Sequence, residues 1–138
     1  MTVAVPYTAP STNSATGSPA HGPAAGYDLS GTLMDAALER LEAARGWDDR
    51  RLTPRVDTHR VESAVPIIVE LRATLDLHRG GAIAANVDDL YDYMCRRLKS
   101  AGLPNGIAAL EEVSHLLHAL RSAWAFLPAE VVRAASGN

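Results

Sequence analysis

The sequence has little of what marks a secreted, membrane or nucleic-acid-binding protein. Cys95 is its only cysteine, so no disulfide can form within the chain, and a reducing compartment fits best. No apolar run approaches the roughly 20 residues of a membrane span, and the N-terminus lacks the features of a secretory signal. The formal net charge of −3 shows no basic excess that would favour a nucleic-acid partner. We therefore expect a cytoplasmic protein that binds neither membrane nor nucleic acid.

Aromatic residues are scarce as well, at 5% of the 138 residues, so a core must consist mainly of Leu, Ile, Val and Ala. The first 26 residues hold four of the eight prolines and no Asp, Glu, Lys or Arg. Such a stretch buries too little apolar surface to offset its chain entropy. We therefore predict a flexible, disordered N-terminal arm over residues 1–26 and a helical domain over residues 27–135.

Within that domain, apolar residues recur at the spacing of one helix face in four stretches. These run from a cap at Asp28 or Ser30 to about Arg45, from Thr53-Pro54 to about Leu77, from Ala82 to Ser100, and from Asn105 to about Trp124. No alternating strand pattern is present, and short connections make sequential helices antiparallel neighbours. The sequence thus predicts an all-α, antiparallel four-helix bundle, with a short extra C-terminal helix opened by Pro128. Gly46 should end the first helix, and Pro66 should kink or break the second.

Catalytic and metal-binding patterns are sparse. Glu112 and His115 form one Glu-x-x-His pair, the spacing of carboxylate-bridged di-metal bundles, but such sites need two copies and further carboxylates. Gly80-Gly81 precedes a helix without the strand or the Lys of a nucleotide loop. We expect no cofactor, no metal and no enzymatic activity. A metal-dependent bundle enzyme is the alternative to be tested.

A partner-binding surface is the remaining candidate. Tyr91 and Tyr93 are two residues apart and therefore project about 200° apart on a helix, so both cannot face one core. Tyr93 shares a flank with Asn86 and Leu90, and an aromatic beside an amide suits a protein-binding groove. The alternative is a tyrosine packed at a helix crossing with its hydroxyl in water.

The segment over residues 80–98 resembles the FliS family of flagellar secretion chaperones. That family has Gly-Gly-x-Ile-Ala-x-Asn-Leu, then Leu-Tyr-x-Tyr-Met and a basic pair, and this chain has Gly-Gly-Ala-Ile-Ala-Ala-Asn-Val, Leu-Tyr-Asp-Tyr-Met and Arg-Arg. Residues 33–37, 67–76 and 113–124 are similar to parts of its first, second and fourth helices. Pro6-Tyr7 resembles a tyrosine-bearing segment that can cover the client site in the family.

The resemblance implies a chaperone that binds the C-terminal helical region of flagellin, prevents premature polymerisation and keeps the subunit export-competent. A structural adaptor for other flagellar export components is a further reading. The residues that we expect to bind the partner are Tyr7, Leu33, Ala37, Leu71, Leu75, Ile83, Asn86, Val87, Leu90, Tyr91 and Tyr93.

Overall fold

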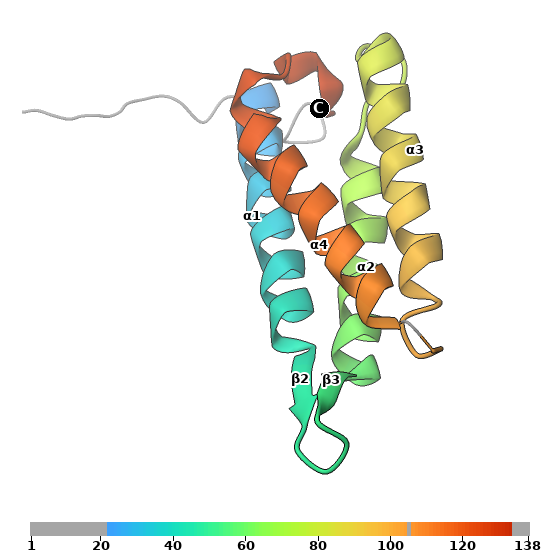
Figure 1. Cartoon of the computed structure of the whole chain (residues 1–138). Helices are drawn as coiled ribbons and strands as arrows, with labels where there is room; N and C mark the ends of the chain where they lie inside the picture. Colours follow the sequence, from blue (N-terminus) through green and yellow to red (C-terminus); the bar gives the residue numbers. More distant parts are fainter. Residues whose placement is uncertain (1–21, 105, 134–138) are drawn as a thin grey trace, which may run out of the picture.

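The computed structural model describes residues 22–104 and 106–133, and in this part the chain forms a bundle of four α-helices with a small hairpin (Figure 1). The elements are α1 (Gly22–Ala43), β2 (Arg45–Asp48), β3 (Thr53–Val56), α2 (Thr58–Thr74), α3 (Gly81–Leu98), α4 (Gly106–Ala123), and the 3-10 helices η2 (Trp124–Phe126) and η3 (Ala129–Val131). Each α-helix runs antiparallel to the one before it, which confirms the predicted bundle. Tyr7 of the arm and Asn105, the predicted cap of α4, lie outside the described residues.

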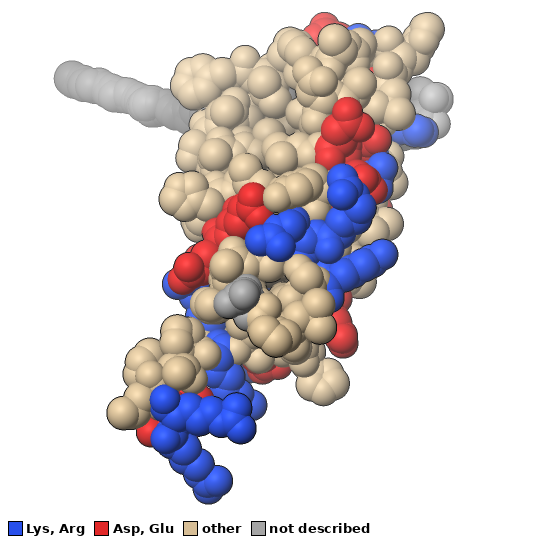
Figure 2. All heavy atoms as spheres, turned by 45° about the vertical axis from the view of Figure 1, so that its right-hand side comes forward, with Lys and Arg blue, Asp and Glu red and all other residues tan. Residues whose placement is uncertain are grey.

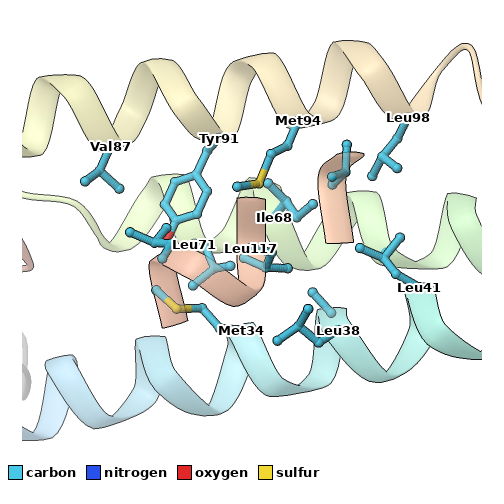
Figure 3. Packing of buried hydrophobic residues seen from close by; sticks show 14 of the residues in the cluster. Met34, Leu38, Leu41, Ile68, Leu71, Val87, Tyr91, Met94, Leu98 and Leu117 are labelled. Carbon is cyan, nitrogen blue, oxygen red and sulfur yellow. The ribbon is translucent and has the colours of Figure 1, made fainter. Parts of the chain in front are cut away.

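The core forms where the apolar stripes of the four helices meet (Figure 3). Every helix contributes fully buried side chains, among them Met34 and Leu41 from α1, Ile68 and Leu71 from α2, Tyr91 and Met94 from α3, and Leu110 and Leu117 from α4. Burying side chains of this size stabilises a fold by about 1.5–3 kcal/mol each. The 3.6-residue pattern in the sequence therefore identifies the surfaces that hold the bundle together.

The connection between α1 and α2 differs from the prediction. Thr53 and Pro54, expected to start the second helix, belong to β3, which pairs with β2 in an antiparallel hairpin. The helix begins at Thr58 instead, because the Asp57 carboxylate accepts hydrogen bonds from the backbone N–H groups of His59 and Arg60. Pro54 is tolerated in β3 because every strand of a two-stranded sheet is an edge strand, where a missing N–H need not break the ladder.

The ends of the helices correct further expectations. Helix α1 begins at Gly22, ahead of Asp28 and Ser30, and it ends at Ala43, before Gly46. Ser30 is buried inside the helix with its Oγ 3.2 Å from Thr74 Oγ1, so it packs against α2 and does not cap. Helix α2 runs through Pro66, which is exposed, and the predicted break does not occur.

The C-terminal segment closes one end of the bundle. Pro128 precedes η3, as predicted, and Val131 and Val132 are fully buried. The Val131 carbonyl accepts a hydrogen bond of 2.8 Å from the Asp76 N–H, which ties the segment to the turn after α2. No helix in the described part of the chain has both the length and the apolarity of a membrane span.

Candidate functional site

The structure separates the predicted partner-binding residues into a buried and an accessible group. Ala37, Leu71, Leu75, Val87 and Tyr91 are at most 7% exposed and belong to the core. They present no surface to a partner in this conformation. Leu33 on α1 is half-buried against the core. The accessible residues on α3 are Ile83, Asn86, Leu90 and Tyr93, which are exposed or half-buried.

These four residues lie on one side of α3. At 100° per residue, positions 83, 86, 90, 93 and 97 fall within a narrow arc beside the buried face. We call this set, Ile83, Asn86, Leu90, Tyr93 and Arg97, the α4-side flank, because its last two members contact α4. The opposite side carries Asp88, Asp92 and Cys95, and we call it the α2-side flank.

The α4-side flank joins α4 through a single carboxylate. Tyr93 Oη donates a hydrogen bond of 2.8 Å to Glu112 Oε2, and Arg97 Nε donates one of 2.5 Å to Glu112 Oε1. The Arg97 guanidinium, followed by the Tyr93 hydroxyl, lowers the pKa of Glu112, and the Glu112 carboxylate in turn raises the pKa of Tyr93. This link lies at the end of the flank where α4 begins. Figure 1 shows α4 diverging from α3 toward the N-terminal end of α3.

The N-terminal half of the flank is therefore the less covered half. Ile83 is 41% exposed there, Asn86 is exposed, and Leu90 is half-buried. On α4, Leu116 follows Glu112 by one turn and is half-buried. The end of the molecule nearest the start of α3 is largely free of Lys, Arg, Asp and Glu, whereas charges of both signs gather along the middle (Figure 2). This flank can take apolar side chains and offers one amide for hydrogen bonding.

The α2-side flank is held by ion pairs. Arg72 of α2 donates from Nε and Nη2 to the two oxygens of Asp88, at 2.9 and 3.2 Å, and from Nη1 to Asp92 at 3.1 Å. Arg96 pairs with the other oxygen of Asp92 at 2.9 Å. The Arg96 guanidinium lowers the pKa of Asp92, and burial raises the pKa of the Cys95 thiol. This flank is committed to packing α3 against α2.

Sequence reasoning missed the link through Glu112. That residue drew attention as half of a Glu-x-x-His pair, but its two oxygens are used by Tyr93 and Arg97, while His115 lines a hollow between α1 and α4. In residues 22–104 and 106–133, no three His, Cys, Asp or Glu side chains group as a metal ion would require. The signal for the link was the basic residue at position 97, one turn beyond Tyr93.

Comparison with known proteins identifies the family. The sequence profile of the family described as Flagellar protein FliS matches residues 21–131. The chain is 44% identical over 92 residues to Flagellar secretion chaperone FliSB of Pseudomonas aeruginosa, which covers 67% of this chain and 72% of the relative. It is 35% identical over 98 residues to Flagellar secretion chaperone FliS of Vibrio cholerae, covering 71% of each chain. Over a shorter stretch of 54 residues it is 52% identical to the Salmonella typhimurium FliS. The chain therefore belongs to the FliS family of flagellar secretion chaperones.

Proposed function

We propose that this chain acts in the cytoplasm by binding the C-terminal helical region of flagellin on the α4-side flank of α3. Binding there prevents premature polymerisation and keeps the subunit competent for export. Two observations support the proposal. The chain belongs to a family whose relatives are named flagellar secretion chaperones. It also presents Ile83, Asn86 and Leu90 at the surface of an otherwise well-packed helix.

The flank suits a helix that lies lengthwise along α3. Ile83 and Leu90 are seven residues apart, about two helical turns or 10 Å, which is the spacing of successive apolar anchors on an amphipathic partner helix. Asn86 lies between them and can pair with a polar group of the partner. Tyr93, fixed by its hydrogen bond to Glu112, offers a ring of defined orientation at the far end.

The buried residues of the predicted partner-binding set support the α4-side flank from the core. Val87 and Tyr91 alternate with the flank residues and are buried, and the Tyr91 side chain points toward Leu71 of α2 (Figure 3). Leu75, just after α2, belongs to the same core. In this proposal they position the flank and do not touch flagellin. We keep Tyr7 and Leu33 as proposed contacts with flagellin. Tyr7 lies outside the described residues, and Leu33 is half-buried on α1.

The energetics require a long interface. A flagellin segment that folds on binding loses about 2–5 kcal/mol or more of the gross interaction energy to ordering. Only a few aliphatic and aromatic contacts need to carry the remainder, since fewer than about a third of interface residues dominate a typical binding free energy. Ile83, Leu90 and Tyr93 are the natural anchors, because each combines accessible area with a fixed helix backbone.

The test is binding of full-length flagellin, measured by co-elution in size-exclusion chromatography and by calorimetry. We expect the wild-type chain to co-elute with flagellin and the double variant Asn86→Ala/Tyr93→Ala to bind at least about tenfold more weakly. A matched control is Asp89→Ala/Lys99→Ala, which changes one exposed position of α3 and the exposed residue just after its end, both outside the flank. Tyr93→Phe separates the ring from the Glu112 hydrogen bond.

Two results would contradict the proposal. One is the absence of co-elution with wild-type protein. The other is equal affinity of the double variant and the wild type when circular dichroism shows the same helical content, because that would remove the flank from the interface.

A further inference from the structure

The hairpin end of the molecule carries exposed apolar side chains that the flagellin proposal does not use. The hairpin of β2 and β3 projects beyond the helices, at the opposite end from the start of α3 (Figure 1). Trp47 in β2 is 56% exposed, although it lies across from Pro54 in the ladder. Leu52 in the turn is 71% exposed, and Leu103 in the neighbouring connection between α3 and α4 is 62% exposed. Exposed Trp and Leu side chains grouped at one end indicate a contact surface.

The charge of this end is opposite to that of the whole chain. Residues 45–56 hold four arginines and two aspartates, a net charge of +2, while the full sequence carries −3. Both aspartates lie beside the turn, and Asp48 Oδ1 accepts hydrogen bonds from the backbone N–H groups of Arg50 and Arg51. Lys and Arg side chains gather at this projecting end in Figure 2.

Most of these arginines are available to a partner. In the part of the chain that the structure describes, neither Arg50 nor Arg55 has a carboxylate within 4.0 Å. The Arg51 side chain is 83% exposed, and its only pairing there is a long contact of 3.9 Å with Asp48. Arg45 is different, because it bridges to Glu111 of α4 at 3.3 Å and so anchors the base of the hairpin.

A hollow lies beside the arginines. Most of its lining residues are apolar by type, but most of the surface that it exposes is polar. Its volume is about 340 Å³, and it is lined by Arg51, Pro54 and Val56 of the hairpin together with Leu103 and Ile107. A second hollow of about 250 Å³ between α2 and α3 shares Thr58, Ala101 and Gly102 with the first. Lys99 lines this second hollow.

We propose that the hairpin end is a second docking surface, for an acidic segment of another protein that carries an apolar anchor. The anchor packs against the exposed Leu103 side chain, which lines the hollow together with Arg51, and carboxylates on either side pair with Arg51 and Arg55. A protein partner fits better than a nucleic acid, because this end exposes the apolar side chains of Trp47, Leu52 and Leu103. In addition, two aspartates interrupt the basic residues and would repel a continuous line of phosphates.

The position of this surface makes it independent of the α4-side flank. Helix α3 has 18 residues and so extends about 27 Å, which separates Ile83 near its start from the hairpin end. A partner on the hairpin would therefore leave the flank open. A chaperone with both surfaces could hold a client at one end and be recognised at the other.

The experiment uses the full chain and fluorescein-labelled peptides of about ten residues, long enough to span about 33 Å when extended. One peptide alternates Glu with Leu and Phe, a second replaces every Glu by Lys, and a third replaces every Leu and Phe by Ser. Oligothymidine and phosphatidylglycerol vesicles are the other probes. Fluorescence polarisation should show saturable binding of the first peptide alone, weakening as salt is added.

Two pairs of variants decide whether the hairpin is the site. Arg51→Glu/Arg55→Glu should weaken binding of the first peptide at least about tenfold, and Arg51→Ala/Arg55→Ala should weaken it by a smaller factor without reversing the charge. The matched control is Arg40→Glu/Arg79→Glu, the same charge change at two exposed arginines outside the hairpin, one in the last turn of α1 and one just before α3. It should stay within about twofold of wild type.

Several outcomes would overturn the inference. These are no binding of the acidic peptide, equal binding of the Ser-substituted peptide, equal loss in the control pair, or tighter binding of oligothymidine or vesicles with the same arginine dependence. The alanine pair keeps the test decisive if the glutamate pair fails to fold.

Discussion

The two flanks of α3 come from the same helix and meet the same core, yet their surroundings differ. On the α2-side flank, Arg72 holds Asp88 with two parallel hydrogen bonds and also reaches Asp92. On the α4-side flank, the hydrogen bonds to α4 within the described residues are those of Tyr93 and Arg97 to Glu112, at one end. Ile83 and Asn86 have accessible side chains. The charged side chains of the α2-side flank are thus paired within the chain, whereas the α4-side flank has side chains that a partner can still contact.

The difference shows how one helix can serve stability and recognition together. In a bundle, each helix contacts a neighbouring helix on both sides of its buried face, but the two sets of contacts need not be equally strong. Here the geometry of a forked guanidinium fixes one side. The other side needs only the Tyr93–Glu112–Arg97 link where α4 starts, so the rest of that side is free for a partner.

The largest effect should come from Tyr91, the buried residue between the flanks. Tyr91→Ala should lower the free energy of unfolding by about 3–5 kcal/mol, because it leaves a cavity beneath both flanks. Tyr91→Phe should do the opposite and raise it by up to about 1 kcal/mol, since the Tyr91 hydroxyl is buried with no hydrogen-bond partner among the described residues. Urea unfolding measures both values.

Flagellin affinity is the second measurement for Tyr91. The Phe variant should bind within about twofold of wild type, because the hydroxyl is buried and points into the core (Figure 3). A clear loss of affinity in Tyr91→Phe would instead place Tyr91 in the interface and erase the distinction between the buried face and the flank.

The next largest effect should be on flagellin affinity, and it should differ between the two flanks. Ile83→Asp places a charge on the exposed part of the α4-side flank and should weaken flagellin binding at least about tenfold, while changing stability by less than about 1 kcal/mol. The matched change on the other side is Asp92→Asn, which should leave the affinity unaltered. Calorimetry with flagellin gives the affinities, and equal losses in both variants would mean that the client crosses both flanks.

A smaller effect should show that the α2-side flank contributes stability through the geometry of the hydrogen bonds between Arg72 and Asp88. Arg72→Ala should cost about 1 kcal/mol of unfolding free energy, in the range expected for a partly exposed ion pair. Arg72→Lys should recover only part of that, because an ammonium cannot reproduce the two parallel bonds to Asp88. Urea unfolding of the three proteins tests this, and a lysine variant as stable as wild type would show that charge alone is sufficient.

The part of the fold that could be predicted from the sequence is the part in which buried residues recur at helical spacing. The apolar stripes that contain Met34, Ile68, Met94 and Leu117 are all buried. Each helix removes its apolar face from water by packing that face against the other helices. The hairpin could not be predicted, because four-residue strands carry no periodic signal and Thr53-Pro54 is also a good helix start. The contact that ties the base of the hairpin to α4, between Arg45 and Glu111, also joins residues far apart in the sequence.

The candidate site could be predicted only in part, for a related reason. Periodicity and resemblance pointed to α3, and the flank that contains Asn86, Leu90 and Tyr93 lies where the sequence placed it. The sequence could not say where the core ends and the flank begins. That boundary depends on the angle at which α4 crosses α3, so Val87 and Tyr91 were grouped with residues that are accessible.

The smallest effect concerns the link that limits the α4-side flank. The pKa of Glu112 is lowered in the folded chain, so its ionised form contributes stability above the ordinary carboxyl value of 4.5, and this contribution disappears as the pH falls through the lowered value. Glu112→Gln should therefore melt at a slightly lower temperature than wild type at pH 7, and the two melting temperatures should converge as the pH is taken below about 4. Asp89→Asn, an exposed carboxylate of α3, is the control and should show little difference at either pH. A gap that persists in acid would mean that Glu112 acts through packing, and the single polar tie between the flank and α4 would then owe nothing to its charge.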